Sequence, residues 1–352
     1  MKELAARTDV VTDWIRQLAQ RAAVYFPRRT GERSYRFEPV TADSAIDLAA
    51  YVPTIVPPNK KLMPAVDELM RFREQADHVS VDPVLDASHR ILAGVRSCDL
   101  KAIALLDRAQ ADGMGDPHYR ARRDNTAIIA VDCPKPCDDR AFCQAVRSLG
   151  HKQGADVYLT FADGQSRRSA VEAQFVVESL TPKGDDLVAS AKLDACPDAA
   201  ALLKKAAEAR PKPFGRQLAL AVDKLPATLR AEQRSAAWEK HVKSCFSCGT
   251  CTMVCPTCYC FDVKDDLGFD LVSGNRVRTW DSCMLPEFTV VAGGHNFRPE
   301  PAARQRHRVK RKFEYLMERF GGESFCVGCG RCGRQCTTHI DIFDIVNDVA
   351  RG

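Results

Sequence analysis

Two cysteine runs with the same spacing decide the fold of this chain. The first reads Cys245-Phe-Ser-Cys-Gly-Thr-Cys-Thr-Met-Val-Cys255-Pro256, and the second reads Cys326-Val-Gly-Cys-Gly-Arg-Cys-Gly-Arg-Gln-Cys336-Thr337. Both follow the pattern CxxCxxCxxxC, in which three thiolates bind one iron–sulfur cube. The fourth cysteine binds the other cube in two-cluster ferredoxins. The doubled spacing therefore predicts two [4Fe-4S] clusters.

The expected ligand sets are crossed between the two runs. Cluster 1 takes Cys245, Cys248, Cys251 and Cys336, and cluster 2 takes Cys326, Cys329, Cys332 and Cys255. Other interpretations fit less well. A zinc ribbon needs two CxxC pairs and has no use for the third cysteine of each run. A c-type haem needs CxxCH, which the sequence lacks, and disulfide frameworks are typical of small secreted domains.

The composition is that of an ordinary soluble protein. The 352 residues suffice for two domains with separate cores, and 45% of them are hydrophobic and 28% charged. A net charge of +5 does not by itself call for nucleic acid or a membrane surface. No apolar stretch approaches the length of a membrane span, and charges interrupt Met1–Val24, so we expect no export signal. Thiols kept for metal favour a reducing cytoplasm.

Three regions of the chain differ in residue composition and pattern. Residues 1–190 alternate between strand-like and helix-like segments, which predicts an α/β or α+β domain. Residues 191–240 are rich in strong helix formers and predict a helical connector. Residues 241–352 hold the two cysteine runs and predict a largely helical, ferredoxin-like domain with two [4Fe-4S] clusters.

The expected elements follow from apolar periodicity and turn residues. Helices are predicted at Leu4–Phe26, Asp67–Phe72 and Arg304–Phe320, with two or three more between Asp198 and Lys243. Strands are predicted at Tyr35–Val40, Thr126–Val131, Asp156–Phe161 and Ala170–Leu180. A further strand begins at Arg90 and leads through a tight loop into a helix, for which we expect Asp99 to be the N-cap.

Four cysteines outside the two runs fall at strand ends and loops of the N-terminal region. They are Cys98, Cys133, Cys137 and Cys143. Sites of α/β folds gather at such loops, so these four thiols can hold a third cluster. The alternative is that some are small buried hydrophobic residues, as free cysteines often are. Their spacing matches no fixed cluster motif, and both interpretations stay open.

Three more cysteines, Cys258, Cys260 and Cys283, accompany the first run. Both cubes are complete without them, so we favour lining of the cluster pocket, where they would tune the reduction potential, over ligation. Cys196 has no partner pattern and is expected to be structural.

A basic stretch lies between the two runs, with six Lys or Arg residues from Arg304 to Lys312. Such a stretch alone can indicate a nucleic-acid patch, but few aromatic residues accompany it. A docking face for an acidic partner, cations that favour reduced clusters and a solvated helix face are the alternatives. The sequence has no GxGxxG motif opening a helix and no Walker loop, and we expect His295 to hold a turn.

Several motifs together resemble a known family. They include Cys258-Tyr-Cys-Phe-Asp-Val263, Trp280-Asp-Ser-Cys283, Ala292-Gly-Gly-His-Asn-Phe-Arg298, Phe325-Cys-Val-Gly-Cys-Gly-Arg-Cys332, Gly94-Val-Arg-Ser-Cys-Asp99, Leu106-Asp107 and Phe142-Cys143. The chain resembles the iron–sulfur beta subunit of cytoplasmic sulfhydrogenases and the dicluster iron–sulfur subunit of the anaerobic sulfite reductase. Thr337 stands where such motifs usually have proline.

The resemblance implies an electron-transfer subunit without substrate chemistry of its own. Its partners would be a flavoprotein subunit that binds FAD and NAD(P)H and a catalytic subunit holding nickel–iron, or sirohaem in the sulfite reductase alternative. Two other classes stay open. One is a stand-alone reductase with a site-differentiated cluster near Cys98 or Cys283, and the other is a nucleic-acid-binding protein, which would show salt-sensitive binding.

Overall fold

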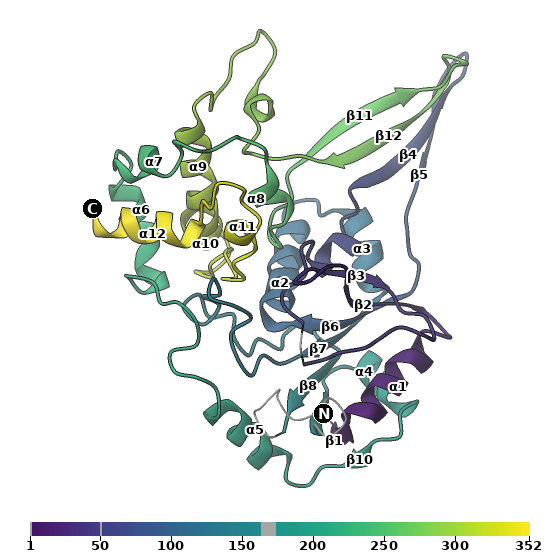
Figure 1. Ribbon diagram of the computed structural model, residues 1–352. Helices are drawn as coiled ribbons and strands as arrows, with labels where there is room; N and C mark the ends of the chain where they lie inside the picture. Colours follow the sequence, from purple (N-terminus) through teal and green to yellow (C-terminus); the bar gives the residue numbers. More distant parts are fainter. Residues whose placement is uncertain (1, 50, 163–173) are drawn as a thin grey trace.

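The computed structural model describes residues 2–49, 51–162 and 174–352. It has an N-terminal body built on a large sheet, an arm formed by a small sheet, and a helical C-terminal part that holds both cysteine runs (Figure 1). The arm points away from the rest of the molecule.

The large sheet has eight strands in the order β10-β1-β9-β8-β7-β6-β2-β3. Its centre, β2-β6-β7-β8, is parallel, and the outer pairings are antiparallel. The strands are β1 Lys2–Arg7, β2 Ala23–Arg29, β3 Tyr35–Pro39, β6 Arg90–Arg96, β7 Thr126–Val131, β8 Val157–Phe161, β9 Gln174–Ser179 and β10 Asp194–Ala195. The parallel centre places the carboxyl ends of β6 and β7 at one edge, which is where α/β folds keep their sites.

Helices cover both faces of this sheet. Alternate residues of the buried strands face opposite sides, so Ile91 and Ile129 pack with Trp14 of α1, whereas Leu92 and Ile128 pack with α2. The helices are α1 Thr8–Leu18, α2 Ser97–Ala111, α3 Pro117–Asp124 and α4 Pro182–Ala189, with a 3-10 turn at Pro58–Lys61. The prediction of an α/β N-terminal region is confirmed as far as the fold class is concerned.

The predicted strands at residues 35–40, 90–95, 126–131 and 156–161 are present, as is the helix after β6. The strand predicted at Ala170–Leu180 is β9, and residues 170–173 lie outside the described residues. Three predictions are wrong. The single helix at Leu4–Phe26 is β1, α1 and the start of β2, because its ends pair with β9 and β6. Asp67–Phe72 is a strand, and Asp99 lies inside α2, whose N-cap is Arg96.

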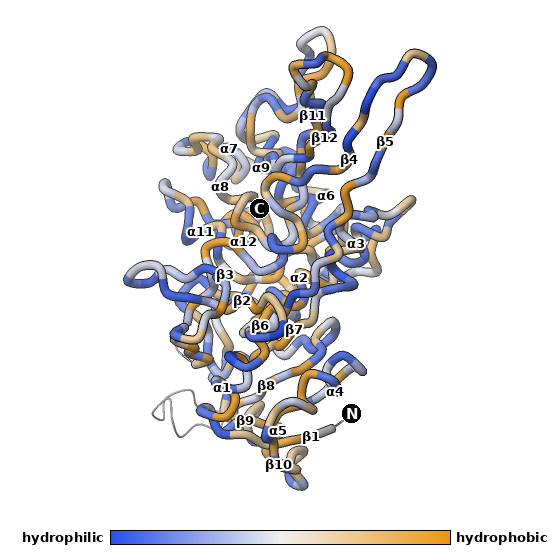
Figure 2. Tube along the Cα trace, turned by 90° about the vertical axis from the view of Figure 1, so that its right-hand side faces the viewer, coloured by the Kyte–Doolittle hydropathy of each residue, from blue (hydrophilic) through white to orange (hydrophobic). Residues whose placement is uncertain are grey.

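The arm is an antiparallel sheet in the order β11-β12-β4-β5. Its strands are β4 Val66–Glu74, β5 Val79–Pro83, β11 Phe261–Leu267 and β12 Ser273–Trp280, so it joins two distant parts of the sequence. Figure 2 shows β4 and β5 standing away from the body, with hydrophilic and hydrophobic residues along them.

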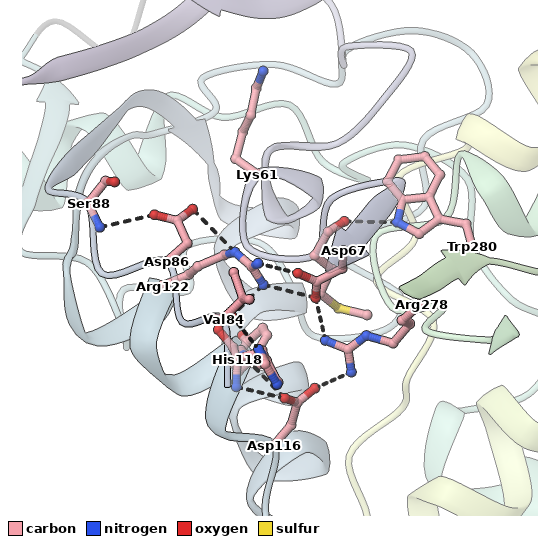
Figure 3. A network of polar contacts seen from close by, with 12 residues as sticks. Lys61, Asp67, Val84, Asp86, Ser88, Asp116, His118, Arg122, Arg278 and Trp280 are labelled. Carbon is pink, nitrogen blue, oxygen red and sulfur yellow. Dashed lines mark hydrogen bonds and ion pairs between the residues drawn. The ribbon is translucent and has the colours of Figure 1, made fainter. Parts of the chain in front are cut away.

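A network of buried charges fixes the arm to the body (Figure 3). Asp67 of β4 accepts hydrogen bonds from Arg278 of β12, at 2.7 Å from Nη2, and from Arg122 of α3, at 3.1 Å from Nη1. Arg278 also pairs with Asp116, the N-cap of α3. Removing one partner of such a network leaves a buried charge uncompensated, so each of these residues contributes to the attachment of the arm at its base.

The C-terminal part is built from helices and one hairpin. Of the predicted connecting helices, α5 Ala199–Glu208 packs on β8 and β9 of the large sheet. α6 Leu225–Ala231 and α7 Ala237–Lys240 belong to the C-terminal part, with a 3-10 turn at Val222–Lys224. The helix predicted at Arg304–Phe320 is α9 Pro301–Lys310, a π turn at Arg311–Tyr315 and α10 Leu316–Arg319, and α12 Ile342–Arg351 ends the chain. The expectation of a largely helical cluster domain is not confirmed, because the insert between the runs also holds the two strands β11 and β12.

Candidate iron–sulfur sites

The first group of thiols surrounds a small cavity and draws on both runs. The three first cysteines of one run and the last cysteine of the other line it, namely Cys245, Cys248, Cys251 and Cys336. Met284 and Arg308 complete its wall. Burial raises the pKa of the Cys251 thiol, whereas the Arg308 guanidinium lowers it, and the other three thiols act on it as well. The structure therefore places these four sulfur atoms around one space.

The second group joins Cys326, Cys329 and Cys332 to Cys255. Burial raises the pKa of Cys326, Cys329 and Cys332, and the negative charge of the Cys255 thiolate raises each of them further. For Cys332 the pKa reaches about 12. The Thr257 hydroxyl, two residues after Cys255, donates to the carbonyl of Phe325, which precedes Cys326, so the end of the first run lies beside the start of the second.

The two runs share a local backbone conformation. The residue before the second cysteine has positive φ in both, at +53° for Ser247 and +67° for Gly328. The residue after it, Gly249 or Gly330, has positive φ too and starts a short helix, α8 Thr250–Met253 or α11 Arg331–Arg334. Such backbone angles favour glycine. The two short helices, α8 and α11, contact each other. The repeated spacing thus folds into repeated loops that face one another.

The basic stretch between the runs turns its charges inward. Arg304, Arg308, Lys310 and Lys312 are buried, so this stretch is neither a solvated face nor a basic surface patch. The Lys312 Nζ donates to Thr257 Oγ1 at 2.7 Å, and thiolates near it, Cys255 first, raise the pKa of Lys312 against the effect of burial. Among the described residues, no carboxylate forms an ion pair with Arg308 or Lys312.

Arg308 lies between the two groups of thiols. Burial opposes its charge, but Cys251 of the first group and Cys332 of the second raise the pKa of the Arg308 guanidinium above its ordinary value. Gln305 Oε1 accepts a hydrogen bond from Arg308 Nη1 at 3.0 Å. A cation placed in this way stabilises negative charge at either group.

A third group of thiols lies at the edge of the N-terminal body. Cys98, Cys133, Cys137 and Cys143 line one small, enclosed cavity together with Cys329 of the second run. Burial raises the pKa of Cys98 and also that of Cys143, to about 12. A hydrogen bond from Cys137 lowers the pKa of Cys133 and raises that of Cys137.

The other cysteines fall into three places. The thiol of Cys258 hydrogen-bonds to that of Cys255, which lowers the pKa of Cys255 and raises that of Cys258. Cys283 is hydrogen-bonded to Cys260 and lowers the pKa of Cys260 to about 6. Cys196 is buried beside Asp198, in a separate apolar cluster under β9, away from these groups.

Some residues around the thiols carried no recognisable sequence signal. Buried Lys60 donates to the Cys258 carbonyl at 2.9 Å and lies 4.5 Å from the centre of the Trp280 ring. Arg331 of α11 is buried against Asp99.

His295 was expected to hold a turn. It lies in an exposed turn in which its carbonyl accepts a hydrogen bond from the Val291 amide, and its ring is edge-on to Phe297.

The donor set of these groups fits iron–sulfur clusters. Within the described ranges, no three His, Cys, Asp or Glu side chains converge closely enough for a single metal ion. A cube accepts thiolates spread around its corners, and sulfur is the ligand type that such clusters use. The cavity of the first group, lined by four cysteines of the expected set, is therefore compatible with one of the two cubes expected from the sequence.

The chain is similar to known iron–sulfur proteins. The model of the 4Fe-4S dicluster domain matches residues 244–340. The whole chain is 31% identical, over 356 positions covering 100% of it and 99% of the relative, to Sulfhydrogenase 2 subunit beta of Pyrococcus furiosus. The chain belongs to the 4Fe-4S dicluster family of sulfhydrogenase beta subunits. No solved structure matches it.

Membership of the sulfhydrogenase beta-subunit family confirms the resemblance seen in the motifs. This family member is an iron–sulfur, electron-transfer protein with 4Fe-4S clusters, as the cysteine spacing predicts. In the part of the chain that the structure describes, no helix has the length and apolarity needed to cross a bilayer.

Proposed function

We propose that this chain carries single electrons through two [4Fe-4S] clusters with crossed ligands. The observation that supports this most directly is the cavity lined by three cysteines of the first run and by Cys336 of the second. Cluster 1 is held by Cys245, Cys248, Cys251 and Cys336. Cluster 2 is held by Cys326, Cys329, Cys332 and Cys255. When bound, each cube supplies reversible one-electron redox chemistry.

The chain's own residues set the charge around these clusters. Arg308 and Lys312 are buried cations without carboxylate partners among the described residues, and thiols of both groups lie near them. A reduced cube is more negative than an oxidised one, so these cations favour reduction and raise the reduction potential. Cys258, Cys260 and Cys283 line the surroundings and tune the potential through weak hydrogen bonds to sulfur.

The partners that we propose follow from the family. The electrons enter from a flavoprotein subunit that binds FAD and NAD(P)H and leave to a nickel–iron hydrogenase subunit, in the cytoplasm. The anaerobic sulfite reductase complex is the alternative home. The relative's printed name, subunit beta, supports a complex of several subunits. No substrate chemistry on this chain and no nucleic-acid binding are part of the proposal.

The arm is the surface that we propose for contact with a companion subunit. Its apolar side chains are exposed on the two edge strands, with Val79 and Val81 on β5 and Leu267 on β11, and in the turn after β11, with Phe269 and Leu271. Exposed apolar residues gathered in this way mark protein interaction sites. The charge network at the base of the arm holds this surface in a fixed position (Figure 3).

The crossed wiring has a direct test in the full chain, isolated without oxygen. Electron paramagnetic resonance of the reduced protein is compared for Cys245→Ala, Cys336→Ala, Cys329→Ala and Cys255→Ala. Crossing predicts that the first two variants alter one cluster signal and the last two alter the other. If Cys336→Ala instead matches Cys329→Ala, each run holds its own cluster and the proposed wiring is wrong.

A second test addresses the class of function. The purified chain should accept electrons from a chemical reductant and pass them to a redox dye, but it should reduce neither protons nor sulfite alone. Turnover of a substrate without any companion protein would instead favour a stand-alone reductase, with chemistry at a cluster near Cys98 or Cys283.

A further inference from the structure

We propose that Cys98, Cys133, Cys137 and Cys143 hold a third iron–sulfur cluster, in the N-terminal body. This site lies outside residues 244–340, which the dicluster model matches. It extends the proposed relay but does not depend on it, because its four ligands are separate from those of clusters 1 and 2.

The topology of the large sheet brings the four cysteines together. Cys98 and Cys133 follow the carboxyl ends of β6 and β7, which are adjacent parallel strands. Cys137 and Cys143 lie in the long loop that follows β7. The carboxyl ends of adjacent parallel strands meet at one edge of the sheet, where α/β folds place their ligands. The four cysteines therefore converge there, although they are spread over the sequence.

The loop that carries Cys143 is fixed against the second cysteine run. The Phe142 amide donates to the Gly328 carbonyl at 2.9 Å, and a Cβ on Gly328 would lie 2.6 Å from backbone atoms of Phe142 and Cys143. Such a close approach needs glycine. The position of Cys143 is therefore set by the same turn that positions Cys329.

The cavity has the lining of a cluster site. Its sulfur atoms come from the four cysteines and Cys329, and its other walls include Leu149, Phe214 and Ala141, which are apolar. Cys98, Cys133 and Cys143 are buried, and none of the four forms a disulfide. Apolar walls exclude water and so protect a cluster from hydrolysis and oxidation.

A buried cation beside the cavity needs an anionic neighbour. Arg96, which is 5% exposed, donates to the Asp132 carbonyl at 2.6 Å and to the Leu48 carbonyl at 2.9 Å, and its guanidinium carbon lies 4.0 Å from the centre of the Tyr51 ring. Among the described residues it forms no ion pair with a carboxylate. Burying an unpaired guanidinium is strongly unfavourable, and thiolates around a cluster would supply the missing negative charge.

The same pattern recurs at the other two thiol groups. Arg308 and Lys312 are also buried cations beside thiols, without carboxylate partners among the described residues. A buried positive charge therefore lies beside each of the three groups of cysteines, with Arg308 shared by the first two. Neutral, structural thiols would not compensate such a buried positive charge.

Cys329 connects the third site with cluster 2. It belongs to the proposed ligands of cluster 2 and also lines the cavity of the third site. The two clusters would be neighbours across this one residue, and the relay would run from cluster 1 through cluster 2 into the N-terminal body. Each step moves one electron from a reduced cube to an oxidised one and makes or breaks no bond.

Iron and acid-labile sulfide per chain test the proposal in the full-length protein, isolated anaerobically. About twelve iron atoms are expected for three cubes, against about eight for two. Cys133→Ala combined with Cys143→Ala should lose about one third of the iron and one component of the reduced electron paramagnetic resonance spectrum. Cys196→Ala is the matched control, because Cys196 is equally buried but far from the cavity, and it should lose neither.

Several outcomes overturn the proposal. They are a wild-type count of about eight, zinc in place of iron, or a double variant that keeps all the iron. The wild-type count decides even if the double variant does not fold. Failure of this proposal is distinguishable from failure of the proposed relay. If only the third site is wrong, the protein still contains clusters 1 and 2, and Cys245→Ala still alters one of their signals.

Discussion

Arg331 and Asp99 form a buried, two-pronged ion pair, with Nη2 of Arg331 2.7 Å from Oδ2 of Asp99. Arg331 precedes Cys332 of the second run, and Asp99 follows Cys98 at the end of β6. The Arg331 Nε also donates to the Thr54 carbonyl at 2.6 Å. This pair therefore joins the cluster 2 loop to the N-terminal body at the point where the third site lies.

Asp99→Asn should destabilise the protein strongly. The change keeps the shape of the side chain but leaves the Arg331 charge buried without its partner, at a cost of about 3–5 kcal/mol. The midpoint temperature at which the visible cluster absorbance is lost should fall by several degrees. Asp112→Asn is the control, because Asp112 pairs with Arg319 on the surface and such pairs contribute about 0–1 kcal/mol. Equal effects of the two changes would mean that the buried pair does not hold the loop.

Gly328→Ala should destabilise the loop of the second run by more than the usual cost of a non-glycine residue at a positive φ. The new Cβ would meet backbone atoms of Phe142 and Cys143 at 2.6 Å, so the loop must shift. Gly293→Ala is the control, with positive φ but open space around it. Its cost should stay near the roughly 1–2 kcal/mol of a left-handed residue. Iron content and thermal midpoint should fall clearly for Gly328→Ala, and similar values for both variants would contradict this close packing.

Arg308→Gln should make the clusters harder to reduce. A unit charge near a cluster contributes about 1–4 kcal/mol at the effective dielectric constants of proteins. Since about 59 mV corresponds to a tenfold change for one electron, the potential should become more negative by on the order of 60 mV or more. Redox titration followed by electron paramagnetic resonance measures this. Arg308→Lys keeps the positive charge and should leave the reduction potential near that of the wild type. Arg306→Gln, on the same helix but less buried, should change the reduction potential little.

Phe269→Ser combined with Leu271→Ser should weaken assembly with a companion subunit. Both side chains are exposed at the tip of the arm, Phe269 fully. If a partner covers them, each substitution should reduce the binding free energy by about 1.5–3 kcal/mol, because less apolar surface is buried. Co-purification from the native host should drop, whereas iron content should not. Met114→Ser, at a fully exposed position on another loop, serves as the control. Unchanged co-purification of the double variant would exclude the arm tip as a contact.

The features that could be predicted from the sequence are local ones. Cluster ligands three residues apart need only one turn of chain, so the two runs were recognisable without the fold. The strands β6 and β7 were equally clear, since Ile91 to Val95 and Ile128 to Val131 are buried on both faces. A continuous apolar run of that length is typical of a parallel strand.

The features that were missed depend on distant partners. Asp67 belongs to a strand rather than a helix because β12 supplies the pairing edge from residues 273–280. Asp99 binds Arg331 instead of capping a helix, and neither residue signals the other in the sequence. For the basic stretch at residues 304–312, the sequence left surface roles open beside a role at the clusters, and the fold decides between them by placing thiols from both runs near Arg308.

The arm has a consequence for how this polypeptide can be divided. Two of its strands precede the cysteine runs by a long distance and two lie between them, so a fragment that starts near residue 241 would expose the edge of β12 that β4 now covers. Unpaired edges of this kind recruit other chains and aggregate. We expect the ferredoxin-like half to be inseparable from the N-terminal half, both in recombinant expression and in the exchange of gene segments during evolution.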